Sequence, residues 1–162
     1  MTINEKLVKI LKDNNMTIST AESCTGGLIA KMITDVSGSS DVFGYGFVTY
    51  ANEAKMNILG VWEDALLTFG AVSEPVALLM SRGAKKRSGS DIAVSVTGIA
   101  GPGGGTKEKP VGLVYISLAT PDGAICKKCN FSGTRDEIRQ QTAEFALNLA
   151  YKYVGLKCGE LS

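Results

Sequence analysis

The stretch VGLVYISLA, residues 111–119, is apolar on both faces, and the sequence Thr120-Pro121-Asp122-Gly123 follows it. An apolar run of this length predicts a central strand, because only a central strand buries both of its faces. Proline, aspartate and glycine are typical of tight turns. The turn leads into residues 124–131, which we interpret as an antiparallel hairpin partner.

Outward from this hairpin, strand-like segments alternate with helical ones, which is typical of an α/β domain. Further strands are predicted at residues 16–21, 45–50 and 91–97. Capping boxes indicate helix starts at Thr2 and Thr134, and a serine N-cap followed by proline indicates one at Ser73. Short helical patterns indicate two more, after residues 22–24 and at Asn52. We therefore expect a single three-layer α/β/α sandwich over residues 1–162, with four or five helices and a mixed sheet of five strands or slightly more.

The overall charge is nearly balanced, with 17 basic and 16 acidic residues and a net charge of +1. Such a chain has no bulk field that attracts nucleic acid or an anionic membrane, so neither is an expected partner. The charge-free run at residues 92–106 is shorter than the roughly 20 apolar residues that span a bilayer. The N-terminus, MTINEKLVKI, lacks the apolar core of a signal peptide, so we expect a cytoplasmic protein.

The sequence contains no histidine, which excludes Ser-His-Asp triads, Cys-His pairs and HExxH zinc sites. The four cysteines include one CxxC pair, Cys126 and Cys129, whose side chains diverge if the segment is a strand. Cys24 and Cys158 do not form the second close pair that a zinc site requires. We therefore expect no metal or other cofactor and interpret the cysteines as structural, although Cys24 adjoins the turn at Ser23.

The segment AESCTGG, residues 21–27, follows a predicted strand and begins a predicted helix. A serine at this point can be exposed by a tight turn, with backbone N–H groups nearby that can bind an oxyanion or a phosphate. Lys55 is a candidate base, because burial lowers the pKa of lysine and Ser-Lys pairs replace histidine in some hydrolases. The alternatives are that Ser23 only caps a helix and that Lys55 is a solvated surface group.

The glycine-rich segment at residues 97–106 also follows a predicted strand. It fits neither the P-loop nor the GxGxxG pattern, although its glycines permit a close approach to a ligand. Arg135 and Arg139 are four residues apart at the start of the last helix, where a bound anion would offset their unfavourable interaction with the helix dipole. The alternatives are a plain flexible loop and pairing of the arginines with Asp136.

With these motifs in the order AESCTGG, TYANEAK and TGIAGPGGG, the sequence closely resembles the C-terminal domain of CinA, the competence/damage-inducible protein. The resemblance covers nearly the whole chain. It implies an amidohydrolase that converts nicotinamide mononucleotide (NMN) to nicotinate mononucleotide and ammonia in pyridine nucleotide salvage. The alternative function is a non-catalytic module that binds nucleotides or partners in competence or the DNA damage response.

The resemblance also implies roles for individual residues. Ser23 resembles the nucleophile, Lys55 its base, and Tyr50 a nearby polar catalytic group. Arg135 and Arg139 resemble phosphate-binding residues, and a homodimer is implied. We expect further substrate contacts from three segments. They are Thr25, Gly26 and Gly27 in the turn, Asn52 on the same helix face as Lys55, and Thr97, Gly98 and Gly101 in the glycine-rich segment.

Overall fold

A computed structural model describes residues 1–161 of the chain. Its helices and strands follow one another in this order: α1 (Ile3–Asp13), β1 (Ile18–Glu22), α2 (Leu28–Thr34), the 3-10 helix η1 (Ser39–Asp41), β2 (Phe43–Val48), α3 (Asn52–Leu59), α4 (Glu63–Phe69), α5 (Glu74–Ser88), β3 (Ile92–Gly98), β4 (Leu113–Thr120), β5 (Gly123–Asn130) and α6 (Arg135–Lys157).

The five strands form one mixed sheet in the order β2-β1-β3-β4-β5. Strand β1 pairs in parallel with both β2 and β3, whereas β4 runs antiparallel to β3 and to β5. Glu22, the last residue of β1, lies opposite Val48 of β2 and Val96 of β3. The carboxyl ends of three neighbouring strands therefore meet at one edge of the sheet.

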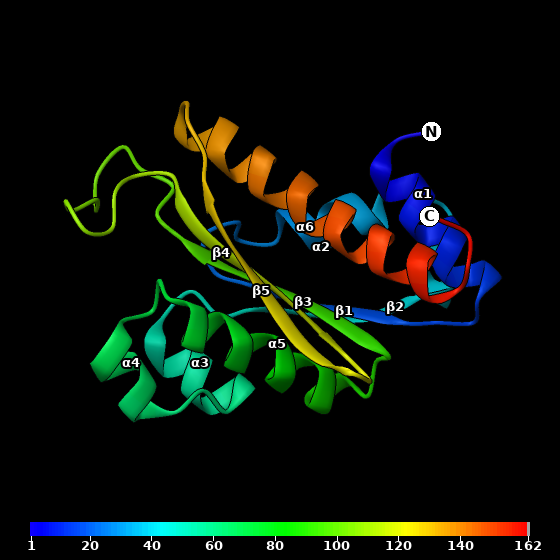
Figure 1. The fold of residues 1–162 in the computed structure, drawn as a ribbon, viewed down its shortest axis with the longest axis horizontal. Helices are drawn as coiled ribbons and strands as arrows, with labels where there is room; N and C mark the ends of the chain where they lie inside the picture. The colour runs from blue at the N-terminus through cyan, green and yellow to red at the C-terminus, as the bar shows by residue number, and fades with distance from the viewer. Residues whose placement is uncertain (162) are drawn as a thin grey trace.

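Helices cover both faces of the sheet, so the expected three-layer α/β/α sandwich is confirmed (Figure 1). Helices α1, α2 and α6 pack on one face around an extensive aliphatic core. Helices α3, α4 and α5 pack on the other face around a smaller core that includes Val76 and Met80. The central position of β4 follows from its sequence, because residues such as Val114 and Ile116 are fully buried.

The capping residues act as their sequence pattern indicates. The hydroxyls of Thr2 and Thr134 each accept a hydrogen bond from the N3 backbone N–H, and the glutamate at N3 accepts one from the cap in return. Ser73 accepts a hydrogen bond from the Val76 N–H at the start of α5. Such caps satisfy N–H groups that have no partner within the helix.

The strand ends shift by one or two residues from their predicted bounds, and residues 1–161 contain one α-helix more than predicted. Helix α4 is not predicted, because it has only seven residues and Trp62, at its N-cap position, makes no capping hydrogen bond. Strand β2 ends at Val48 rather than at residue 50. Thr49 and Tyr50 consequently lie outside the strand, which leaves their carbonyl groups available to a side chain. No described helix is long and apolar enough to cross a membrane.

Candidate functional site

Ser23 lies directly after β1, at the edge where the parallel strands end. Its backbone N–H donates to the Val96 carbonyl at 3.1 Å, so the pairing of β1 with β3 extends to this residue. The chain then turns into α2 through Gly26 and Gly27, whose φ angles are +62° and +108°. These are left-handed conformations that glycine adopts without strain. We call residues 22–30 the nucleophile turn.

Lys55 lies in α3 and is 1% exposed. Its Nζ is 3.1 Å from Ser23 Oγ and donates to the carbonyl oxygens of Thr49 at 2.8 Å and Tyr50 at 3.1 Å. Burial lowers the pKa of Lys55, because the charged form loses its hydration. In the neutral form, two N–H groups can donate to the carbonyls while the lone pair accepts the Ser23 hydroxyl proton.

Cys24, beside Ser23, belongs to the aliphatic core between the sheet and α6. Burial raises the pKa of its thiol to about 12. A neutral, buried thiol is a poor nucleophile. The Ser23 hydroxyl, by contrast, is partly exposed.

Glu22 has a place in the site that the sequence analysis does not identify. Its buried carboxylate accepts hydrogen bonds from Thr25 Oγ1 at 2.6 Å and from the N–H groups of Ile29 at 2.8 Å and Ala30 at 3.0 Å. These two N–H groups in the first turn of α2 are thus occupied and cannot bind a further anion. The Thr25 hydroxyl is occupied as well. An acidic residue just before a helix start is the signal that could have indicated this cap.

Arg135, at the start of α6, connects two of the predicted segments. It donates to the Gly101 carbonyl at 2.8 Å and to the Tyr50 hydroxyl at 3.2 Å. The Tyr50 side chain is 61% exposed, and its phenol faces Arg135 while only its backbone carbonyl contacts Lys55. The structure therefore places the Tyr50 hydroxyl with the predicted phosphate-binding group.

Arg139 lies one helical turn further along α6 and contacts the nucleophile turn. Its guanidinium donates to the Thr25 carbonyl at 2.8 Å, and a Cβ at Gly26 would lie 3.2 Å from Nη2. The pair with Asp136 is long, at 4.0 Å. Glycine at position 26 thus admits the guanidinium, which supports the turn directly.

Among the remaining predicted contacts, Thr97, Gly98 and Gly101 pack closely against other parts of the fold. Thr97 is 1% exposed, and its hydroxyl donates to the Ala71 carbonyl at 2.9 Å. At Gly98 a Cβ would lie 2.6 Å from Val114 Cγ2, and at Gly101 it would lie 2.5 Å from Val111 Cγ1. Asn52 is exposed at the first residue of α3. Within residues 1–161, no hydrogen bond joins the Asn52 or Thr97 side chain to Ser23 or Lys55.

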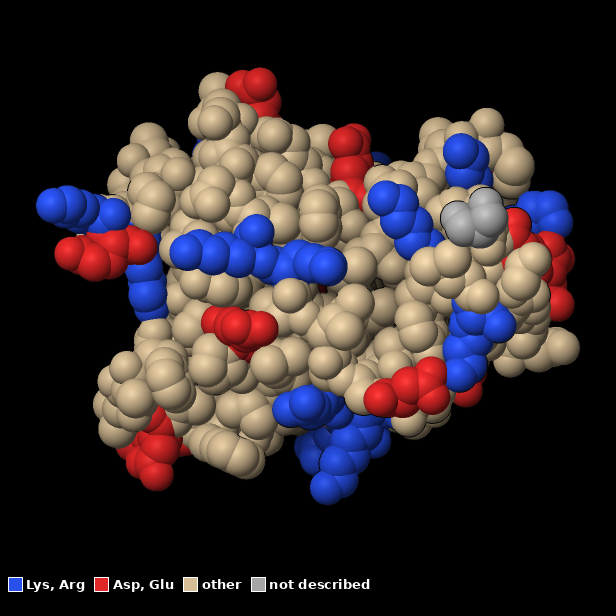
Figure 2. Space-filling view, in the orientation of Figure 1, with Lys and Arg blue, Asp and Glu red and all other residues tan. Residues whose placement is uncertain are grey.

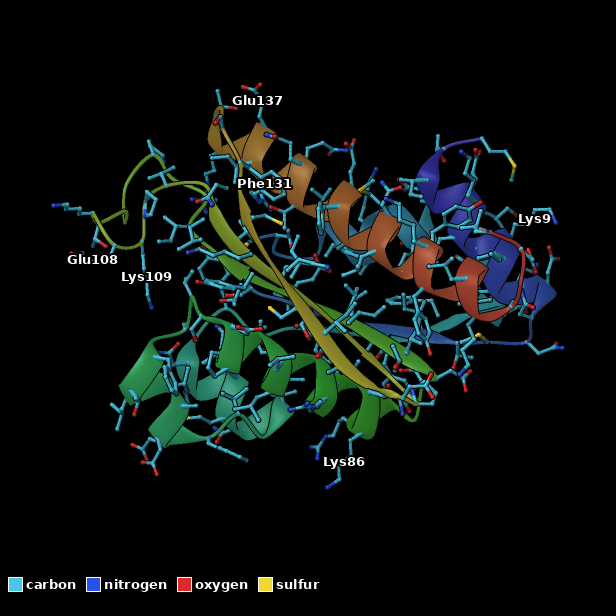
Figure 3. The ribbon with its side chains drawn as sticks, viewed as in Figure 1. Lys9, Lys86, Glu108, Lys109, Phe131 and Glu137 are labelled. Atoms are coloured by element: carbon cyan, nitrogen blue, oxygen red, sulfur yellow. The ribbon has the colours of Figure 1, made fainter. Side chains whose placement is uncertain are left out.

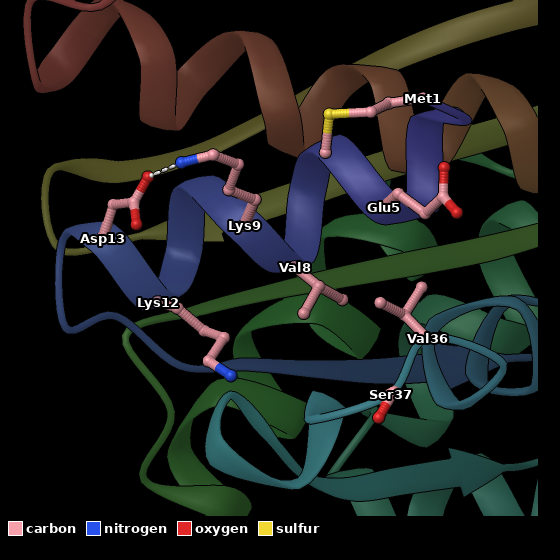
Figure 4. A pocket seen from close by; sticks show the side chains of 8 residues that line it. All are labelled: Met1, Glu5, Val8, Lys9, Lys12, Asp13, Val36 and Ser37. Carbon is pink, nitrogen blue, oxygen red and sulfur yellow. Dashed lines mark hydrogen bonds and ion pairs between the residues drawn. The ribbon is translucent and has the colours of Figure 1, made fainter.

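The surface outside this site carries mixed charges and a hollow beside α1. Basic and acidic side chains are intermixed on the face shown in Figure 2. A hollow of about 440 Å³ beside α1 is lined by Val8, Val36 and charged groups such as Lys9, which already pairs with Asp13 (Figure 4). The part of the chain that the structure describes contains no cluster of three potential metal ligands.

Comparisons with known proteins show the family to which the chain belongs. Residues 1–154 match the family described as the CinA C-terminal domain. The chain is 50% identical to the nicotinamide-nucleotide amidohydrolase PncC of Escherichia coli, over 94% of this chain and 93% of that protein. It is 52% identical to a competence-damage inducible protein of Symbiobacterium thermophilum, but spans only 38% of that longer relative. The crystal structure of the competence/damage inducible protein CihA from Agrobacterium tumefaciens superposes with a TM-score of 0.87, at 48% identity, and covers 91% of this chain and 92% of that one.

Proposed function

Because this chain belongs to the family of the CinA C-terminal domain, we propose that it is a nicotinamide-nucleotide amidohydrolase that converts NMN to nicotinate mononucleotide and ammonia. The observation that carries this proposal is the contact of 3.1 Å between the buried Lys55 Nζ and Ser23 Oγ. A serine that lies beside a desolvated lysine is an activated nucleophile, and amide hydrolysis requires one.

In the proposed reaction, neutral Lys55 accepts the Ser23 proton while Ser23 Oγ attacks the carboxamide carbon of NMN. This attack forms a tetrahedral intermediate, and a backbone N–H donor of the nucleophile turn stabilises its oxyanion. Within residues 1–161, the N–H group of Cys24, the residue after Ser23, has no backbone acceptor, so it is the donor we propose. Protonated Lys55 then gives its proton to the departing nitrogen. Water attacks the acyl-enzyme with Lys55 again as base, which regenerates Ser23.

The phosphate of NMN needs cationic partners, and Arg135 is the group best placed to supply one. It is exposed, and its two hydrogen-bond acceptors, the Gly101 carbonyl and the Tyr50 hydroxyl, are both uncharged. Guanidinium groups bind phosphate through paired N–H donors. We therefore propose that Arg135 holds the phosphate, with Tyr50 beside it, while Arg139 acts mainly on the turn.

We also propose that the protein acts as a cytoplasmic homodimer without a nucleic-acid or membrane partner. The net charge of +1 and the intermixed charges in Figure 2 support the absence of a polyanionic partner. Light scattering of the purified chain tests the dimer. A monomer that is fully active on NMN would contradict a dimeric active form.

The test of the function is ammonia release from NMN, with nicotinate mononucleotide identified by chromatography, in the presence of EDTA. Wild type should be active, and Ser23→Ala and Lys55→Met should not. Lys86→Met is the matched control, because Lys86 is an exposed residue that points away from the sheet (Figure 3). A wild-type protein that binds NMN but releases no ammonia would support the non-catalytic nucleotide-binding alternative instead.

A further inference from the structure

Glu22 combines complete burial with an unusual set of partners. It is 0% exposed, and within residues 1–161 no lysine or arginine pairs with it. Buried carboxylates are costly unless their oxygens are hydrogen-bonded or paired with a cation. All three donors to Glu22 come from the segment that follows Ser23: the Thr25 hydroxyl and the backbone N–H groups of Ile29 and Ala30.

The backbone of Glu22 is fixed from the other side. It pairs with Val48 in β2 and with Val96 in β3, and its carbonyl accepts the Thr49 N–H at 2.9 Å. Glu22 thus joins three parallel strands through its main chain and joins the turn to α2 through its side chain. Ser23 is the next residue, so its backbone lies between these two sets of contacts.

Thr25 receives contacts at both of its polar ends. Its hydroxyl donates to Glu22 Oε1 at 2.6 Å, and its carbonyl accepts from Arg139 Nη2 at 2.8 Å. The Gly26 N–H donates to the Ser23 carbonyl at 3.1 Å and closes the turn. Because Thr25 is fully buried, these contacts are shielded from water and fix the path of the turn.

We propose that Glu22 is a positioning residue for Ser23, acting through the Thr25 hydroxyl and the first turn of α2. It does not touch substrate. Its role is to hold Ser23 Oγ within reach of Lys55 Nζ, while Arg139 supports the same turn from α6. This inference rests on the proposed function for its substrate, NMN, but its geometry concerns the reactivity of Ser23 itself.

The test uses two variants that break contacts of the bridge and one that keeps them. Glu22→Gln keeps one acceptor oxygen and replaces the other with an NH₂ group, which cannot accept a backbone N–H, so at least one of the three contacts is lost. Thr25→Val removes the hydroxyl, whereas Thr25→Ser retains it. Ser117→Ala is the matched control, because it removes a buried hydroxyl contact, with Ser81 at 2.8 Å, in β4. Thermal melting of each full-length variant shows which ones are folded at the assay temperature.

Two readouts separate positioning from a merely structural role: the kinetic constants for NMN, and the rate at which a fluorophosphonate phosphonylates Ser23 with loss of fluoride. We expect Glu22→Gln and Thr25→Val to lower kcat by about 100-fold with KM nearly unchanged, because small misplacements of a reacting group have effects of this size. Fluorophosphonate labelling should slow in parallel. Thr25→Ser and Ser117→Ala should keep kcat and the labelling rate near the wild-type values.

Several outcomes would overturn the proposal. Folded Glu22→Gln with wild-type kcat and labelling would show that Glu22 only caps α2. If Glu22→Gln does not fold, the comparison of Thr25→Val with Thr25→Ser tests the proposal instead. Equal kcat and labelling rates of these two variants would contradict it. If wild type labels at Ser23 but does not hydrolyse NMN, the proposed function fails while the labelling rates still test Glu22. A wild-type protein inert to both reagents would overturn both proposals.

Discussion

The nucleophile turn and the segment at residues 98–112, which we call the glycine loop, both follow strands that pair with each other in parallel. Both contain glycines, two in the nucleophile turn and six in the glycine loop, but the two segments are held differently. The nucleophile turn is fixed by buried polar side chains, among them Glu22 and Thr25. The glycine loop is exposed over residues 102–108, and Figure 3 shows Glu108 and Lys109 on its projecting part.

This difference indicates which of the two segments can perform chemistry. The position of a reactive hydroxyl relative to its base must be kept to within about 0.5 Å of the productive geometry, which requires rigid support. The glycine loop is tied to the site mainly by the contact between the Gly101 carbonyl and Arg135. We therefore expect substitutions in the nucleophile turn and at Lys55 to affect turnover, and those in the glycine loop to affect substrate binding.

The largest effect is expected at Ser23 and Lys55. Ser23→Ala and Lys55→Met should each reduce kcat by several orders of magnitude, and the double variant should be hardly worse, because a nucleophile and its base act as a unit. Gly103→Ala, in the glycine loop, should keep kcat near the wild-type value. Steady-state kinetics on NMN measure this, and near-normal turnover by Ser23→Ala would contradict the assigned nucleophile.

The pH dependence of kcat/KM should come from Lys55, which contacts Ser23 of the nucleophile turn. Its pKa is lowered by burial, and the proposed reaction needs the neutral amine. Below that pKa, kcat/KM should fall about tenfold for each unit of decreasing pH, because the neutral fraction falls by that factor. This acid limb of the pH–rate profile, the fall of kcat/KM toward low pH, should be absent from the residual activity of Lys55→Met. A limb that persists in this variant would assign the titration to another group.

Arg135 connects the glycine loop to the site, so its loss should separate binding from chemistry. Arg135→Ala should lower kcat/KM for NMN by roughly 10- to 100-fold, since a charged hydrogen bond contributes about 1.5–3 kcal/mol. Nicotinamide riboside, which lacks the phosphate, should be much less affected. Arg87→Ala, at the exposed end of α5, is the control. Equal losses on both substrates would mean that Arg135 supports the fold rather than the phosphate.

The smallest effect is expected on stability, and it compares one glycine from each region. Gly26 has φ +62° and faces Arg139 at 3.2 Å, whereas Gly103 has no neighbour within 4 Å of an added Cβ. Gly26→Ala should destabilise by about 1–2 kcal/mol, because the left-handed conformation disfavours a side chain. Its Tm should fall by about 2–8 °C. The Tm of Gly103→Ala should stay close to that of wild type, and an equal fall in both would remove the distinction.

The sequence predicts most of the fold because its signals are local. The capping boxes at Thr2 and Thr134 and the apolar segment at residues 111–119 each depend on neighbouring residues only. The family resemblance is confirmed by the match over residues 1–154, and the E. coli relative supports the expected activity. Helix α4 is missed because its packing against α5, rather than its own sequence, stabilises it.

The site is less completely predictable because its contacts join distant segments. The sequence suggests Ser23 and Lys55 as a pair, and the structure places them 3.1 Å apart. For the contacts of Glu22 with the α2 N–H groups the sequence offers only an acidic residue before a helix start, and it gives no sign that Arg139 reaches the Thr25 carbonyl. Those contacts depend on how α2 and α6 pack against the sheet, and a single sequence does not encode such distances in a readable pattern.

The separation of these contacts along the chain has a consequence for folding. Lys55 meets Ser23 across 32 residues, Arg135 meets Gly101 across 34, and Arg139 meets Thr25 across 114. Non-local contacts form late, since loop closure must precede them. In the unfolded chain Lys55 is a hydrated ammonium group, and it meets Ser23 only after β1, β2 and α3 have assembled. In the proposed mechanism, a newly synthesised chain therefore carries no activated serine until these three elements have assembled.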